Sequence, residues 1–335
     1  MEHRYCIEEQ KCEDEMEQVK NEIGVIMSVY NEEPKWLRAA IDSILSQTYK
    51  TFRYYILLDH PDNDVLKEII EEYQKKDERI LFYQNIQNIG LVYSLNKLIG
   101  LVEEPYIARM DADDIACPER LEKELKFLKK HRLDFVVTGA DYLDEDGNIT
   151  PGDAIPNLSP RQVAQSSKYG NVAIHSSWLL KKKIYLKLEG YRNCQYCEDY
   201  DLVLRALQKH TRIGRMEEHL QQYRVRNSSI TLTHALEQDE KVKFLMKSYR
   251  HGKQIADLDV EKLNQRFEAV TDRQRQKYSQ AKHQVDQIAQ YLYQKELRKC
   301  FSVFLSEFLK NQYFRTLFFT KFLNKIRLER IYGQG

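Results

Sequence analysis

Three carboxylates stand within four residues, at Asp111, Asp113 and Asp114, shortly after the apolar run 106–108. Carboxylates this close repel one another, and burying them without partners would be costly. Two aspartates separated by one residue at the end of a strand present oxygens in the same direction, which suits Mg²⁺ or Mn²⁺. An acidic turn that caps the helix expected from Pro118 also explains the cluster. For so short a pattern taken alone, this second explanation is the commoner one.

Two further polar residues follow apolar runs and could join the same site. Asn31 comes after the run 23–29, and Asp59 comes directly after the run 54–58. An aspartate in that position can accept hydrogen bonds from a nucleobase N–H or a ribose hydroxyl. It can equally begin a turn and cap the next helix. Asp59 alone does not decide between these alternatives.

A second group of candidate residues occurs later in the chain. Glu198 and Asp199 open a helical pattern, where the helix dipole stabilises acids even without a catalytic role. The segment 171–178 combines polar groups with His175 and Trp178, a mixture typical of sugar binding. Trp178 stands in an apolar run, which favours a place in the core. His175 fits a binding site or a packed interior equally well.

The elements that must position these residues alternate along the chain. Amphipathic helical patterns separate apolar runs of the kind found in strands buried on both faces, and these runs occupy residues 23–29, 54–58, 80–83 and 106–108. This alternation predicts an α/β fold with a right-handed doubly wound sheet. Ligands of such sheets bind at the carboxyl ends of the strands. We therefore expect the polar residues that follow these runs to meet at one edge.

The composition excludes several classes of protein. The 335 residues carry 52 basic and 51 acidic side chains, a formal net charge of +1, so no excess of positive charge indicates nucleic acid. Six scattered cysteines favour a reducing cytosol over a disulfide scaffold, and the lone pair Cys194 and Cys197 indicates local packing instead of zinc. No apolar run approaches the roughly 18 residues of a membrane span. Residues 1–20 are expected to form a charged extension and not a signal peptide.

Several motifs in fixed order make the chain resemble family 2 glycosyltransferases of the A-type nucleotide-sugar fold, over about residues 23–232. The motifs that carry the resemblance are Ser28-Val29-Tyr30-Asn31, Ser46-Gln47-Thr48-Tyr49, Leu58-Asp59-His60-Pro61, Asn88-Ile89-Gly90, Asp111-Ala112-Asp113-Asp114, Glu198-Asp199 and Tyr223-Arg224-Val225-Arg226. Two positions depart from the common pattern. Leu58 replaces a frequent aspartate, and Arg226 replaces a frequent histidine.

The resemblance implies a role for each candidate residue. Asp111 and Asp113 would hold Mn²⁺ or Mg²⁺, with Asp113 the firmer ligand, and Asp199 would be the catalytic base. Arg226 would neutralise phosphate in place of a histidine metal ligand. Acceptor contacts are expected from His175, Trp178 and Glu198, and contacts with the nucleotide-sugar from Tyr30, Asn31, Asp59, Asn88, Arg109 and Asp111.

The resemblance also implies an activity, the inverting transfer of one hexose in bacterial surface polysaccharide synthesis. The expected donor is UDP-Gal or UDP-Glc, and the expected acceptor is a lipid-diphosphate-linked sugar. A UDP-sugar donor with an α-linkage would give a β-glycoside. Single addition is expected because the chain lacks a Q-x-x-R-W motif and membrane helices. Two alternatives remain: a sugar-phosphate nucleotidyltransferase, which would need a glycine-rich phosphate loop, and a non-catalytic nucleotide-sugar-binding protein at a membrane.

The chain is expected to divide into a GT-A catalytic domain and a helical C-terminal region. The nucleotide-sugar half would span residues 21–114, the acceptor half 115–233, and the helical region 234–335. Near the C-terminus, phenylalanines and leucines between 301 and 323 alternate with lysines and arginines. This aromatic, basic stretch fits the surface of an anionic membrane at the inner face of the cell membrane. It could also pack on the catalytic domain or form a dimer interface. In the catalytic domain, the Pro-containing segment 150–159 is expected to be a mobile loop near the acceptor.

Overall fold

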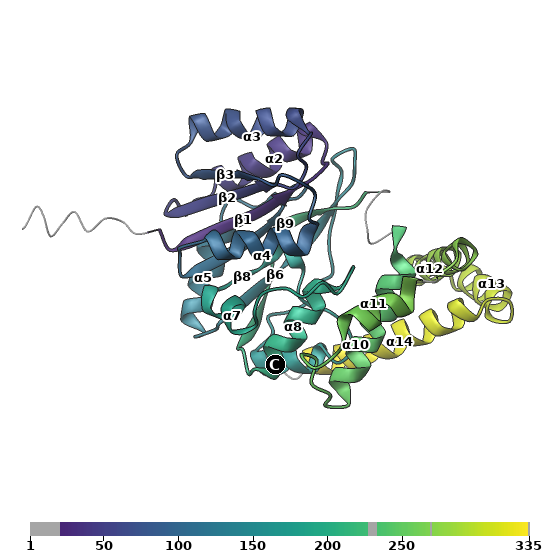
Figure 1. The fold of residues 1–335 in the computed structure, drawn as a ribbon. Coiled ribbons are helices and arrows are strands. Elements are labelled where there is room, and N and C mark those ends of the chain that lie inside the picture. The colour runs from purple at the N-terminus through teal and green to yellow at the C-terminus, as the bar shows by residue number, and fades with distance from the viewer. Residues whose placement is uncertain (1–20, 227–232, 269, 334–335) are drawn as a thin grey trace, which may run out of the picture.

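The computed structural model describes residues 21–226, 233–268 and 270–333. The expected charged extension, residues 1–20, therefore lies outside the described residues. Four parallel strands form the first half of the sheet in the order β3-β2-β1-β4. Their bounds are β1 Ile23–Val29, β2 Phe52–Leu58, β3 Ile80–Gln84 and β4 Tyr106–Asp111. The helices between them are α2 Pro34–Leu45, α3 Asp64–Lys76 and α4 Leu91–Leu101 (Figure 1).

The second half of the sheet contains antiparallel as well as parallel strand pairs. Strand β8 pairs antiparallel with β4 and with β6, while β6 runs parallel to β9, and β5 closes the path beside β9. These strands are β5 Ile115–Ala116, β6 Phe135–Leu143, β8 Leu179–Lys181 and β9 Ile213–Arg224, with β7 Ile149–Thr150 paired to β6. The helices are α5 Arg120–Lys130, α6 Pro160–Ser166, α7 Lys182–Lys187 and α8 Glu198–Gln208, with the short 3₁₀ turn η1 His175–Ser177. The expected α/β fold with a doubly wound mixed sheet is confirmed.

The sheet is buried on both faces because successive side chains of a strand point to opposite sides. In β1, Ile26 belongs to the apolar cluster on one face, and Val25 and Met27 belong to the cluster on the other. All three side chains are fully buried. This explains why the first strand is a continuous apolar run instead of an alternating one.

The strand register brings the candidate residues to one edge. Val29 at the end of β1 lies beside Leu58 at the end of β2, and Ser28 lies beside Asp111 at the end of β4. The segments after these strands therefore begin at the same level. Tyr30, Asp59 and Asp111 consequently occupy neighbouring positions along the carboxyl edge of the sheet.

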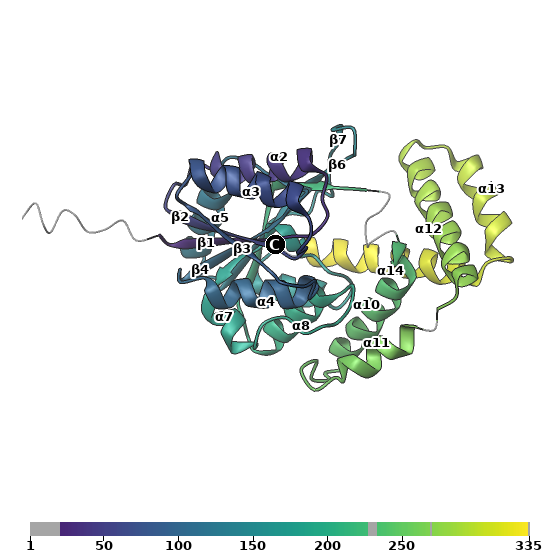
Figure 2. The same cartoon turned by 45° about the horizontal axis from the view of Figure 1, so that its top comes forward.

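In the described residues 233–268 and 270–333, which follow the sheet, the regular elements are helices. They are α10 Ala235–Arg250, α11 Val260–Glu268, α12 Asp272–Tyr293, α13 Leu297–Phe308 and α14 Gln312–Tyr332. Helices α12, α13 and α14 pack together beside the sheet domain, and α14 runs back towards it (Figures 1 and 2). Asn324 of α14 donates to the Tyr169 carbonyl over 2.8 Å, and Gln162 of α6 donates to the Ile331 carbonyl over 3.3 Å. In the part of the chain that the structure describes, none of these helices has the length and apolar character needed to cross a bilayer.

The aromatic C-terminal stretch is partly packed and partly exposed. Phe314 is fully buried against Val285 and Ile288 of α12. Phe301 and Leu305 on α13 are 65% and 59% exposed. Packing on other helices of the chain therefore accounts for some of these side chains and leaves others facing outward.

Candidate active site

A cavity of about 460 Å³ opens at the carboxyl edge of the sheet, between the β4 end, α8 and α10. It gathers six of the residues singled out in the sequence: Asp111, Asp113, His175, Glu198, Asp199 and Arg226. The two acidic motifs are far apart in the sequence, and the sheet brings them to one space. The other residues that line this cavity are Ile89, Gly90, Leu91, Val92, Tyr93, Asn193, Gln195, Tyr196, Tyr223, Arg224 and Gln238.

Asp111 and Asp113 each face a guanidinium. Arg109 Nη2 donates to Asp111 Oδ1 over 2.5 Å, and Arg226 Nε forms an ion pair with Asp113 Oδ2 at 2.9 Å. Burial acts to raise the pKa of the Asp111 carboxyl, but Arg109 with its other polar neighbours outweighs burial and holds this pKa below its usual value. Burial and the charge of Asp111 raise the pKa of Asp113 to about 6. A cation bound at this pair would relieve the repulsion that raises the pKa of Asp113.

The donor set of Asp111 and Asp113 fits a hard divalent cation. Mg²⁺ at nucleotide sites commonly takes one or two carboxylates and completes its shell with phosphate oxygens and water. Among residues 21–226, 233–268 and 270–333, no three His, Cys, Asp or Glu side chains gather closely enough to hold a metal by themselves. The fit to Mg²⁺ or Mn²⁺ therefore depends on a diphosphate to supply the remaining oxygens.

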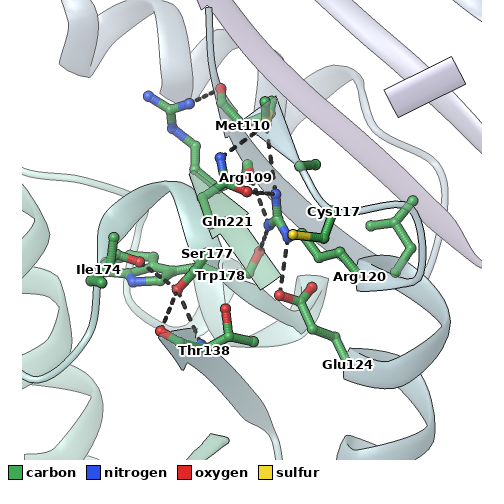
Figure 3. Close-up of polar contacts among 12 residues, drawn as sticks. Arg109, Met110, Cys117, Arg120, Glu124, Thr138, Ile174, Ser177, Trp178 and Gln221 are labelled. Carbon is green, nitrogen blue, oxygen red and sulfur yellow. Dashed lines mark hydrogen bonds and ion pairs between the residues drawn. The ribbon is translucent and has the colours of Figure 1, made fainter. Parts of the chain in front are cut away.

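A buried polar network lies beneath these carboxylates and fixes the end of β4 (Figure 3). Arg120 Nη2 donates to the Arg109 carbonyl over 2.8 Å, and Nη1 donates to Gln221 Oε1 on β9 over 3.1 Å. Arg120 Nε also pairs with Glu124 Oε1 at 3.0 Å, with both side chains fully buried. Burial raises the pKa of Glu124 to about 7 despite this pair. The network joins β4, β9 and α5 directly behind the site.

Asp114, the third acid of the cluster, does not line the cavity. It is 1% exposed, and its Oδ1 accepts from the backbone N–H of Arg224 over 2.8 Å. Burial and the charges of Asp111 and Asp113 raise its pKa well above the usual value. Asp114 therefore links the turn after β4 to β9, a structural contact.

Glu198 and Asp199 form the first turn of α8, with Cys197 at the N-cap position. Asn171 Nδ2 donates to Asp199 Oδ2 over 2.9 Å and orients this carboxylate. Burial raises the pKa of Asp199 to about 6, and burial with the charge of Asp199 raises the pKa of Glu198 to about 8. A carboxylate with a pKa near 6 is ionised at neutral pH and is still basic enough to accept a proton.

His175 and Trp178 have different environments. His175 Nε2 is 2.8 Å from the Tyr191 hydroxyl, and burial and the nearby Arg109 lower its pKa to about 3, so the imidazole is neutral. Trp178 is fully buried, packs edge-on against Phe135 and His175, and does not line the cavity. The expected acceptor contact of Trp178 is therefore wrong, because its indole fills the core; His175 does reach the cavity.

Asp59 is buried and its carboxylate holds the loop after β3. Its Oδ1 accepts from Asn85 Nδ2 at 2.8 Å and from the Ile89 backbone at 3.0 Å, and its Oδ2 accepts from the Gly90 backbone at 2.7 Å. Ile89 and Gly90 line the cavity, so Asp59 shapes the cavity wall. Direct recognition of a base by Asp59 stays a prediction.

Tyr30, Asn31 and Asn88, also expected at the nucleotide, do not line the cavity. Tyr30 is 47% exposed, and its ring stacks on His60 with centroids 5.2 Å apart. Asn31 and Asn88 are exposed, and Asn88 Oδ1 accepts from the Gly90 backbone over 2.9 Å. The stacked Tyr30 and His60 rings offer a flat aromatic surface of the kind that stacks with a nucleobase.

Some residues of the site were missed in the sequence. Tyr196 and Gln195 lie in the loop between Cys194 and α8, and their position just before Glu198 was a usable signal. Arg224 also lines the cavity; it stands in the quoted motif Tyr223-Arg224-Val225-Arg226, but no role was expected for it. Gln238 carried no signal, because only the packing of α10 against the sheet domain brings it there. The segment 150–159, expected near the acceptor, does not line this cavity.

Comparison with known proteins agrees with the geometry. Residues 24–188 match the family described as Glycosyl transferase family 2. An uncharacterized glycosyltransferase of Methanocaldococcus jannaschii is 36% identical over 206 residues, 61% of this chain and 71% of the relative. The O-antigen biosynthesis glycosyltransferase WbnJ of Escherichia coli is 32% identical over 209 residues, 62% of this chain and 81% of the relative. The structure of S. aureus TarS in complex with UDP-GlcNAc superposes with a TM-score of 0.56 at 16% identity, covering 73% of this chain and 71% of that one, which shows a shared fold.

Proposed function

The chain belongs to glycosyl transferase family 2, and on that premise we propose that it is an inverting, metal-dependent hexosyltransferase of bacterial surface polysaccharide synthesis. The donor is a UDP-sugar, with UDP-Gal or UDP-Glc favoured, and the acceptor is a hydroxyl of a lipid-diphosphate-linked sugar. One observation carries the proposal: Asp111, Asp113 and Asp199 line a single cavity. The O-antigen role of one relative and the UDP-GlcNAc bound to TarS support the substrate classes.

Asp199 acts as the base in this proposal. Its carboxylate, oriented by Asn171, takes the proton from the acceptor hydroxyl as the oxygen attacks the anomeric carbon. Attack on the face opposite the leaving diphosphate inverts the configuration, so an α-linked donor gives a β-glycoside. Neutral His175 and the Glu198 carboxyl line the same space and provide hydrogen-bonding groups for the acceptor.

The leaving diphosphate requires compensation of its negative charge. A divalent ion held by Asp111 and Asp113 would act as a Lewis acid and supply the compensating positive charge. Arg226 pairs with the Asp113 carboxylate and also lines the cavity. Guanidinium groups bind phosphate oxygens in pairs, which supports the assignment of Arg226 to the diphosphate.

Two alternatives are less well supported. A sugar-phosphate nucleotidyltransferase needs a glycine-rich phosphate loop after the first strand, and Ser28-Val29-Tyr30-Asn31 contains no glycine. A non-catalytic nucleotide-sugar-binding protein does not require a carboxylate oriented by Asn171 in the same cavity as Asp111 and Asp113.

The location belongs to the same proposal. The enzyme would work in the cytoplasm and contact the inner face of the cell membrane through the exposed apolar side chains of α13, with basic residues such as Lys299 and Lys310 around them. A peripheral contact of this kind combines apolar burial with attraction to anionic lipids. It would place the cavity near a lipid-linked acceptor.

A panel of nucleotide sugars tests the donor assignment. Thermal unfolding is measured with UDP-Gal, UDP-Glc, UDP-GlcNAc, GDP-mannose and dTDP-glucose, each with Mn²⁺ and with EDTA. We expect one UDP-sugar to raise the melting temperature, and only when Mn²⁺ is present, because ligand binding to the folded state stabilises it. Stabilisation by GDP- or dTDP-sugars alone would contradict the assignment of a uridine donor. Equal stabilisation in EDTA and in Mn²⁺ would contradict the metal dependence of donor binding.

A further inference from the structure

A second cavity, of about 440 Å³, adjoins the first. Tyr196, Asp199 and Gln238 line both cavities, so the second one begins at the proposed base. Asn171 and Tyr200 of the sheet domain also line it, and its other walls come from α10, α12 and α14, helices that follow the sheet domain (Figure 2). The helical C-terminal region therefore forms one side of a space that opens directly from Asp199.

A third cavity, of about 370 Å³, continues from the second. Val285 of α12 and Lys321 of α14 line both of them. The third cavity lies between α12 and α14, which pack along one another. The three cavities thus lie in series through shared lining residues, from the carboxylates of the sheet edge to the groove between α12 and α14, and we call this series the track.

The second cavity has the mixed lining that binds sugars. Its charged residues are balanced, with Lys243, Lys282 and Lys321 against Asp199, Asp239 and Asp286. Lys243 pairs with Asp239 at 2.6 Å, and Lys321 pairs with Asp286 at 2.7 Å. Tyr196, Tyr278, Val242 and Leu317 add aromatic and apolar surface. Hydrogen-bonding groups of both kinds beside apolar faces suit the hydroxyls and C–H faces of a neutral glycan.

The third cavity has a different lining. Its residues are Val285, Ile288, Ala289, Leu292, Phe318, Lys321, Phe322 and Lys325. Among these described residues two are basic and none is acidic. Leu292 and Phe322 are 51% and 55% exposed, so the apolar groove is open to the outside. Such a groove with two lysines fits a hydrocarbon chain that begins with a phosphate group.

The linings of the three cavities change in the same order as the parts of a lipid-linked glycan. The base Asp199 would meet the reacting hydroxyl, the mixed second cavity the sugars, and the basic, apolar third cavity the phosphate and the lipid. We propose that this track is the acceptor site, with the glycan in the second cavity and the phosphate and first part of the lipid in the third. Lys321 and Lys325 bind the phosphate, with Lys321 exchanging its solvent-exposed ion pair with Asp286 for the phosphate, and Lys282 contacts the glycan. This assignment rests on the proposed glycosyl transfer, and it gives the C-terminal helices a role in acceptor recognition.

Binding of geranylgeranyl diphosphate to the full-length protein tests the lipid end. We expect Lys321→Ala combined with Lys325→Ala to raise the Kd by about tenfold or more, since charge-assisted bonds to phosphate are lost. The matched control, Lys253→Ala with Lys262→Ala, removes two lysines from the same helical region outside the track and should change the Kd less than twofold. Inorganic pyrophosphate and geranylgeraniol, which carry one half of the ligand each, should bind far more weakly.

A second probe tests the glycan. Geranylgeranyl diphosphate linked to N-acetylglucosamine should bind more tightly than geranylgeranyl diphosphate alone. Lys282→Ala should remove that gain, and Lys277→Ala, on the same helix α12 but outside the cavities, should keep it. Equal affinities of the wild-type protein for the two probes would overturn the glycan assignment.

The UDP-sugar melting shift is recorded for every variant as a separate readout of the donor site. Unchanged donor shifts with weakened lipid binding support the track. The acceptor track is contradicted if the double variant of Lys321 and Lys325 binds the lipid as well as the wild type does. It is also contradicted if the lipid binds no more strongly than pyrophosphate. In both cases an unchanged donor shift leaves the proposed transfer intact. Absence of any nucleotide-sugar shift in the wild type instead overturns the proposed transfer itself.

Discussion

Asp113 and Asp114 are adjacent acids with separate tasks. Asp113 lines the cavity and pairs with the Arg226 guanidinium, whereas Asp114 is buried and accepts the backbone N–H of Arg224. The chemistry of the cluster therefore depends on which side of the turn each carboxylate occupies. This difference separates a metal ligand from a structural acid within one short motif.

Alanine at each position tests this separation. Asp113→Ala should abolish the Mn²⁺-dependent part of the UDP-sugar melting shift and leave the free energy of unfolding nearly unchanged. Asp114→Ala should lower the free energy of unfolding by about 1–3 kcal/mol, because it leaves a buried N–H without a partner. Urea unfolding and thermal shift give the two readouts. A loss of Mn²⁺ dependence in Asp114→Ala alone would contradict the assignment.

The pH dependence of transfer follows from Asp199. Its pKa is raised to about 6 by burial, and a base must be ionised to accept a proton. The transfer rate should therefore rise about tenfold per pH unit below pH 6 and level off above it. The same shift affects stability: a carboxyl with a raised folded-state pKa stabilises the fold fully at low pH, and this contribution is lost as pH rises from about 4 to 6. A rate that stays constant between pH 5 and 7 would contradict the role of Asp199.

At the scale of the elements, α5 supports the site from behind. Arg120 and Glu124 are fully buried, one turn apart, and Arg120 also binds the β4 backbone (Figure 3). A buried pair of this kind is costly to break by removing one partner, although replacing both partners with apolar residues is often tolerated. The pair therefore gives a sharp test of how the β4 end is held.

Arg120→Met should lower the free energy of unfolding by about 3–5 kcal/mol, because Glu124 is left buried without its partner. The double variant Arg120→Met with Glu124→Leu should recover much of this loss. Chemical denaturation measures both. If the double variant were no more stable than the single one, the Arg120 contacts to Arg109 and Gln221 would account for the stability, and not the ion pair.

The elements also show how far the sequence can be interpreted. The runs before Asn31, Asp59 and Asp111 end level with one another because parallel strands in register share an edge, and hydrophobic patterning is enough to predict that. The apolar run around Trp178 favoured the core, where the structure places it, but the polar residues beside the indole also suited a sugar site. The place of Gln238 depends on how α10 docks on the sheet domain. Local hydrophobic patterns in the sequence do not predict packing between helices and strands that are far apart in the chain.

At the scale of the whole molecule, apolar side chains remain exposed far from the sheet. Phe301, Leu305 and Leu309 on and just after α13 are 65%, 59% and 80% exposed. The helix has basic neighbours such as Lys299 and Lys310, and an anionic bilayer matches this combination.

Vesicle co-sedimentation tests the membrane contact. The full-length protein should bind phosphatidylglycerol vesicles at low salt and bind less as salt is added, because salt screens the basic residues. Phe301→Ser with Leu305→Ser should weaken binding at least about tenfold, since each buried side chain contributes roughly 1.5–3 kcal/mol. The control, Val65→Ser with Ile86→Ser, removes two similarly exposed apolar side chains from the sheet domain and should leave binding unchanged. Equal losses in both variants would contradict a contact through α13.

The central claim is that Asp199 is the base of a glycosyl transfer, and Asp199→Asn tests it most directly. The amide keeps the shape of the carboxylate and can still bond to Asn171, so the UDP-sugar melting shift with Mn²⁺ should be unchanged. Transfer to a lipid-linked glycan should fall by about 10²–10⁴-fold, the usual contribution of general-base catalysis. Full transfer activity in Asp199→Asn, with the donor bound normally, would contradict the claim.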